Sequence, residues 1–119
     1  MNSLKEFNSR SLLLFTENDR VLAEQLLSMS LEDIPDFYRK SCKALSENRL
    51  DDAIVWIHKI KGIAGTVGAE ILYDICRGFE EQLKSAVSDL NHDQINGELT
   101  AAVNGFCNSP ELQDWISDV

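Results

Sequence analysis

The stretch Ala53–Gly68 reads A-I-V-W-I-H-K-I-K-G-I-A-G-T-V-G, and its apolar residues recur at the spacing of an α-helix. On a helical wheel these residues fall on one arc, which predicts a single buried face. The members of that face are Ala53, Trp56, Ile57, Ile60, Ile63, Ala64 and Val67. His58 lies on the opposite side of the wheel, with Lys61, Gly62 and Gly65 within about 60° of it. We therefore predict a helix that presents His58 to solvent.

The two glycines beside His58 need a physical reason, because glycine inside a helix costs about 1 kcal/mol relative to alanine. Gly62 follows His58 by one helical turn, where a side chain would normally lie beside the imidazole. Its missing side chain would expose the ring and let another protein approach closely. Close packing between helices is the alternative explanation. It is weaker here, since Gly62 and Gly65 face away from the apolar residues.

The histidine and lysine of this helix suit phosphoryl chemistry. Histidine is largely neutral near pH 7, so that one ring nitrogen keeps a lone pair for nucleophilic attack. Lys61 can reach the same patch and balance the roughly two negative charges of a phosphoryl group. Because the transition state of phosphoryl transfer is loose, catalysis consists mainly of positioning and charge balance. A lone exposed histidine is usually an ordinary surface residue, and only the combination points to a phosphoryl carrier.

The rest of the chain predicts further amphipathic helices with short connections. Apolar spacing favours helices over residues 3–16, 21–45, 69–88, 94–106 and 110–117, in addition to the central one. Pro35 should end or kink the second of these near residues 33–34, or open a new segment there. Acidic Asp51 and Asp52 favour the start of the central helix, and Gly68 is a natural end.

These elements predict an all-α fold, an antiparallel four-helix bundle with an additional short N-terminal helix. The 119 residues allow one domain, residues 1–119, with a bundle core at about 18–107. The three cysteines, Cys42, Cys76 and Cys107, form no metal-binding or redox motif and are expected as small core residues.

Charge and hydropathy exclude several classes of function. The net charge of −9 argues against nucleic-acid binding, although eight of the eleven basic residues lie between Arg39 and Lys84. No apolar run is long enough to span a membrane and no signal segment opens the chain, so a cytoplasmic location without membrane contact is expected. The glycine spacing at Gly62, Gly65 and Gly68 lacks the other residues of a phosphate-binding loop. His92 is expected in a loop without metal-binding neighbours.

The string H-K-I-K-G-I-A-G-T-V-G-A, His58 to Ala69, resembles the signature H-x-x-K-G-x-x-x-x-x-G of histidine phosphotransfer (HPt) domains. It is most similar to the C-terminal HPt modules of Arc-type hybrid sensor histidine kinases. The resemblance implies that His58 is phosphorylated through Nε2 with the assistance of Lys61. It also places Glu80 where many members have a residue that hydrogen-bonds the other ring nitrogen. An ordinary salt-bridged surface remains the alternative for Glu80.

The resemblance implies response-regulator receiver domains as partners, and a sensor kinase in the same parent chain as a possible one. Expected docking residues around the histidine are Ile54, Val55, Lys59, Gly62 and Gly65. The interface should be small and transient, because a carrier must release both partners, and the domain itself should be monomeric. No cofactor or metal is expected in this chain, since Mg²⁺ belongs to the receiver. Without an ATP-binding motif, the domain is expected to carry phosphoryl groups without kinase activity.

Two other interpretations remain open on sequence grounds. One is a phosphorylation-silent helical bundle that acts only as a protein-interaction module. The other is the phosphorylated N-terminal module of a chemotaxis-type kinase, which would require a following kinase region.

Overall fold

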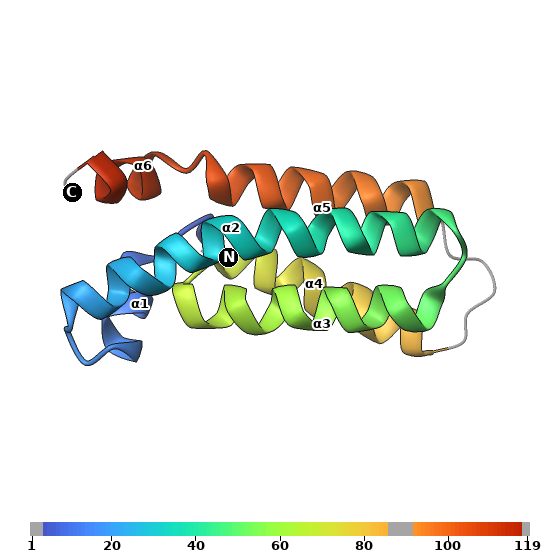
Figure 1. The fold of residues 1–119 in the computed structure, drawn as a ribbon, viewed down its shortest axis with the longest axis horizontal. Coiled ribbons are helices and arrows are strands. Elements are labelled where there is room, and N and C mark those ends of the chain that lie inside the picture. Colours follow the sequence, from blue (N-terminus) through green and yellow to red (C-terminus); the bar gives the residue numbers. More distant parts are fainter. Residues whose placement is uncertain (1–3, 86–91, 118–119) are drawn as a thin grey trace.

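The computed structural model describes residues 4–85 and 92–117, and these ranges contain helices and no strand. The six helices are α1 (Ser9–Phe15), α2 (Arg20–Ser46), α3 (Leu50–Val67), α4 (Glu70–Lys84), α5 (His92–Cys107) and α6 (Pro110–Ser117). Helices α2 to α5 run alternately up and down as a four-helix bundle, with α1 and α6 at one end (Figure 1). The predicted fold class, including the short N-terminal helix, is confirmed.

Helix α3 lies between α2 and α4 and supplies much of the core. Its buried residues are Ala53, Ile57, Ile60, Ala64 and Val67, all of which belong to the predicted apolar face. Trp56 and Ile63 lie at the edges of that face and are half-buried, and Trp56 stacks on Phe37 of α2 at 5.4 Å between ring centroids. This packing fixes the rotation of α3 about its axis, so that His58 faces outward.

Both ends of α3 lie where the sequence predicts them. Asp51 and Asp52 occupy the first turn, where negative charge is favoured. Gly68 ends the helix in the left-handed conformation with a φ of 84°, which glycine adopts without steric cost. A side chain there would also collide with the Asn8 carbonyl oxygen, which leaves no room for a Cβ atom. The turn between α3 and α4 therefore requires glycine.

The N-terminal helix is shorter than predicted. It begins at Ser9, with Asn8 as its N-cap, whereas the prediction extended it back to residue 3; residues 1–3 lie outside the described part. The preceding residues are not helical because their backbone pairs with the α3–α4 turn instead. The Asn8 amide donates to the Gly68 carbonyl at 2.8 Å, and the Ile71 amide donates to the Lys5 carbonyl at 3.1 Å.

Helix α2 does not end at Pro35. Of the three predicted effects of this proline, a helix end near residues 33–34 and a new segment are wrong, whereas a kink is compatible with the continuous helix. The helix runs from Arg20, which follows the N-cap Asp19, to Ser46 as one continuous element (Figure 1). Proline removes one amide donor, but residues on both sides of it, including Ile34 and Ala44, are buried against the bundle. Tertiary packing therefore outweighs the local cost of proline.

The C-terminal elements mostly match their predictions. Helix α4 ends at Lys84 with Ser85 as its C-cap, earlier than the predicted end near Ser88; Val87 and Ser88 lie outside the described residues. Helix α5 begins at His92, so this residue heads a helix rather than lying in a loop. Helix α6 buries Leu112 and Trp115 as expected. Across residues 4–85 and 92–117, no helix combines the length and apolarity that crossing a membrane requires.

The cysteines are free thiols, as predicted, but only one of them belongs to the core. Cys76 is fully buried in α4, and burial raises the pKa of its thiol to about 12. Cys42 and Cys107 are half-buried at the edges of the bundle. None of the three takes part in the site described below.

Candidate phosphotransfer site

His58 lies in the middle of α3 with its imidazole ring facing solvent. The side chain is 63% exposed, and its Nδ1 atom lies 2.8 Å from Oε1 of Glu80 on α4. The ring is thus accessible to solvent, and its contact with Glu80 holds it in one orientation. The predicted exposure of His58 is confirmed by this geometry.

Glu80 is a buried carboxylate beneath the histidine. Its side chain is only 5% exposed, and it contacts two lysines as well as His58. Lys61 Nζ lies 2.7 Å from Oε2, and Lys84 Nζ lies 2.9 Å from Oε1. The alternative of an ordinary surface ion pair is therefore wrong for Glu80, although it holds for exposed Arg77, which pairs with Asp74 on the same helix.

The charge state of Glu80 determines the tautomer of His58. Burial alone would raise the pKa of this carboxyl, but the ammonium groups of Lys61 and Lys84 and the hydrogen bond to His58 outweigh it and lower the pKa to about 2. Glu80 is consequently ionised near neutral pH and can only accept a hydrogen bond. In the neutral imidazole, Nδ1 of His58 therefore carries the proton, and Nε2, on the other side of the ring, keeps its lone pair.

Lys61 is the better enclosed of the two lysines. Its side chain is 22% exposed, one turn of α3 beyond His58. The contact with Glu80 raises the pKa of Lys61, which keeps the ammonium group charged. Lys61 and His58 thus contact the two oxygens of one carboxylate, and the assistance of Lys61 in phosphoryl transfer stays a prediction.

The two glycines near His58 differ in their surroundings. No atom lies within 4 Å of the position that a Cβ atom would take at Gly62, so the space above this backbone is open. A Cβ atom at Gly65 would lie 3.3 Å from the ring of Tyr73 on α4. Gly62 thus agrees with its predicted role in clearing an approach. At Gly65 the ring of Tyr73 partly fills this space, and the role of Gly65 in docking stays a prediction.

The remaining predicted docking residues surround the exposed histidine on α3. Val55 is 49% exposed, Lys59 is exposed, and Ile54 is partly buried against the core. The Lys59 ammonium lies 5.6 Å from the centre of the Trp56 ring. Whether these residues touch a partner stays a prediction.

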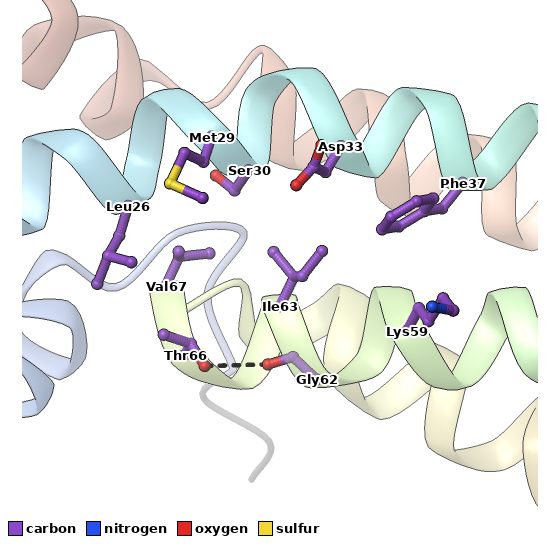
Figure 2. Close-up of a pocket in the computed structure, with 10 residues that line it drawn as sticks. All are labelled: Leu26, Met29, Ser30, Asp33, Phe37, Lys59, Gly62, Ile63, Thr66 and Val67. Carbon is purple, nitrogen blue, oxygen red and sulfur yellow. Dashed lines mark hydrogen bonds between the residues drawn. The ribbon is translucent and has the colours of Figure 1, made fainter.

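An open groove between α2 and α3 adjoins this surface (Figure 2). It is lined by Leu26, Met29, Ser30, Asp33, Phe37, Lys59, Gly62, Ile63, Thr66 and Val67. Figure 2 shows Gly62 at its rim, where the Thr66 hydroxyl donates to the Gly62 carbonyl at 3.1 Å. The groove therefore joins an apolar surface to the open backbone beside His58.

Sequence reasoning missed the part that Lys84 plays in this site. Its i,i+4 spacing from Glu80 was visible, but such pairs are common on helix surfaces and gave no reason to single it out. In the described ranges, His, Cys, Asp and Glu side chains form no cluster that could hold a metal ion. The site consists of four side chains from two helices, His58, Lys61, Glu80 and Lys84.

An all-helical bundle that exposes one oriented histidine beside a lysine defines the class of histidine phosphotransfer proteins. The model of the Hpt domain family matches residues 25–119, and the chain belongs to this family. Its members are phosphoryl carriers that act with receiver domains in two-component phosphorelays. That the whole chain, residues 1–119, forms one such domain stays a prediction.

Among solved structures, the chain is similar to the HPT domain of the Hpt sensor hybrid histidine kinase from Shewanella. The TM-score is 0.74 with 23% sequence identity, over 96% of each chain. This likeness supports the fold. No curated protein matches the chain.

Proposed function

We propose that His58 is the residue that accepts and donates the phosphoryl group. The Nε2 lone pair attacks the phosphorus of a receiver's phosphoaspartate, and the P–O bond breaks as the P–N bond forms. The aspartate leaves as a carboxylate with the electron pair, while the Nδ1 proton stays on the ring, where ionised Glu80 stabilises its positive charge. The observation that carries this proposal is an exposed imidazole whose inner nitrogen is held by a buried carboxylate.

The surroundings of His58 suit a receiver domain as the partner. Open space at Gly62 lets a second protein bring its aspartate close to the ring. The groove between α2 and α3 offers apolar contacts, and exposed Lys59 and Lys84 would attract the acidic pocket in which a receiver holds Mg²⁺. This chain then needs no metal or cofactor of its own.

The wider setting is inferred from the same resemblance. We expect a monomer working in the cytoplasm, with receiver domains both before and after it in the relay. A parent hybrid sensor kinase of the Arc type, tethered to the inner membrane, would place one of those receivers and the kinase in the same chain.

Incubation with a phosphorylated receiver tests the proposal. The domain should acquire a label that is lost in acid and survives alkali, and His58→Gln should abolish it. His92→Gln is the matched control, because it removes the other histidine of the chain and should leave labelling unchanged. Absence of label with every receiver of the same genome would favour a phosphorylation-silent interaction module.

A further inference from the structure

Lys84 shares an oxygen atom with the histidine. Both His58 Nδ1 and Lys84 Nζ contact Oε1 of Glu80, at 2.8 and 2.9 Å respectively, whereas Lys61 contacts Oε2. The Lys84 ammonium, which comes from α4, therefore contacts the same oxygen atom as the imidazole ring from α3.

The two lysines differ in their freedom to move. The side chain of Lys84 is 59% exposed, compared with 22% for Lys61. If Lys84 turned away, each Glu80 oxygen would still keep one partner, because Nδ1 would remain on Oε1 and Lys61 on Oε2. Lys84 can thus leave Glu80 without exposing an unpaired buried charge.

The charges around the ring are unbalanced before phosphorylation. One carboxylate, Glu80, faces two ammonium groups, which leaves one positive charge in excess beside the imidazole ring. A phosphoryl group on Nε2 adds up to two negative charges on the solvent side of that ring. The phosphoryl group can then pair with the excess positive charge. Lys84 is the more exposed of the two lysines and therefore the one that can turn towards it.

We propose that Lys84 is a second cation of the phosphoryl site, which pairs with Glu80 in the free domain and turns to the phosphoryl group once His58 carries it. Lys61 remains on Glu80 and keeps the carboxylate beneath Nδ1. This division of roles rests on the proposed function of His58 and assigns a task to a residue outside the sequence signature.

The experiment uses a chemical donor, potassium phosphoramidate, so that no receiver is required. The phosphorylated chain is titrated by ³¹P NMR, which follows the second ionisation of the phosphoryl group directly. A nearby ammonium favours the dianion, so Lys84→Gln should raise the midpoint of this titration by about half a pH unit or more. Lys84→Arg keeps the charge and should restore the wild-type midpoint.

Lys5→Gln is the matched control. Lys5 is also an exposed lysine in an ion pair, 3.1 Å from Glu111, but its partner lies on α6 rather than in the site. Lys5→Gln removes one positive charge, as Lys84→Gln does, and should leave the midpoint of the phosphoryl titration unchanged. In a transfer assay with a phosphorylated receiver, Lys84→Gln should also slow acceptance by about fivefold.

Two results would overturn the proposal in distinguishable ways. A midpoint in Lys84→Gln equal to that in Lys5→Gln, with His58 phosphorylated in both, would show that Lys84 does not meet the phosphoryl group and would leave the carrier function intact. Failure of His58 to become phosphorylated in the wild-type chain, with either the chemical donor or a receiver, would contradict the carrier function and this role together.

Discussion

At the scale of single residues, the site depends on one carboxylate that performs two tasks. Glu80 accepts the Nδ1 proton of His58, and it also anchors Lys61 beside the ring. The sequence predicted His58 and Lys61 from their shared helix face. The burial of Glu80 was not predictable in this way, because it depends on how α4 packs against α3, which helical spacing within one segment does not specify.

Replacing Glu80 by glutamine should change how stability depends on pH. The folded-state pKa of about 2 lies below the ordinary value of 4.5, so ionised Glu80 stabilises the fold above about pH 4.5. That contribution, about 3 kcal/mol, is lost as the pH falls from 4.5 towards 2. Urea unfolding should therefore show a large stability difference between wild type and Glu80→Gln near neutral pH. The difference should narrow over this acidic range, and a constant one would contradict the ion-pair network.

Substitutions at Gly62 should affect the stability of the fold and the docking of a partner differently. Its Cβ position is open, so Gly62→Ala should raise the free energy of unfolding by up to about 1 kcal/mol through helix propensity. Gly62→Leu should leave the fold intact and slow transfer from a receiver at least about tenfold, because the side chain occupies the approach to His58.

Gly97→Leu is the control for this substitution, since Gly97 on α5 is also open at its Cβ position and lies outside the site. It should leave transfer unchanged. Wild-type transfer by Gly62→Leu would contradict the docking role of Gly62, as would a loss of transfer that merely follows a loss of stability.

At the scale of elements, sequence patterns predicted which segments are helical better than where they begin and end. The apolar face of α3 was correct because the same residues that make it helical also form the core. Whether Pro35 ends, kinks or restarts α2 was left open, because the local effect of proline is visible in sequence whereas the packing that carries the helix past it is not. The extended segment before Ser9 was missed for a similar reason, since its partners are the backbone atoms of Gly68 and Ile71.

The α3–α4 turn gives a test at this scale. Gly68→Ala should lower the free energy of unfolding by at least about 2 kcal/mol, because it places a side chain at positive φ and against the Asn8 carbonyl. Gly78→Ala, on α4 where nothing lies within 4 Å of a Cβ atom, should be neutral or stabilising. Equal effects of the two substitutions in thermal or urea unfolding would contradict the described turn.

At the scale of the whole molecule, an acidic domain with a net charge of −9 places three of its eleven basic residues at or beside one site. Lys61 and Lys84 flank the histidine, and Lys59 lies next to it in the chain. The sequence showed that most basic residues lie between Arg39 and Lys84, but only the fold shows that Lys61 and Lys84 come from two helices and meet at Glu80. These lysines attract an anionic group locally, whereas the rest of the acidic surface repels other acidic proteins.

The same net charge bears on self-association. Since like-charged copies repel one another, we expect sedimentation equilibrium to give a mass near 13.4 kDa at micromolar concentrations. Transfer activity should not depend on self-association. A stable dimer, particularly one that shields His58, would contradict the expectation of a monomeric carrier.

Long-range ¹H–¹⁵N and ³¹P NMR of the His58 side chain tests the central claim most directly. Before phosphorylation, the spectra should show a proton on Nδ1 and none on Nε2, a pattern that Glu80→Ala should weaken. After phosphorylation, phosphorus should couple to Nε2 while the Nδ1 proton remains. A proton on Nε2 in the free domain, or phosphorus on Nδ1 or on His92, would contradict a histidine held by Glu80 for attack through its outer nitrogen.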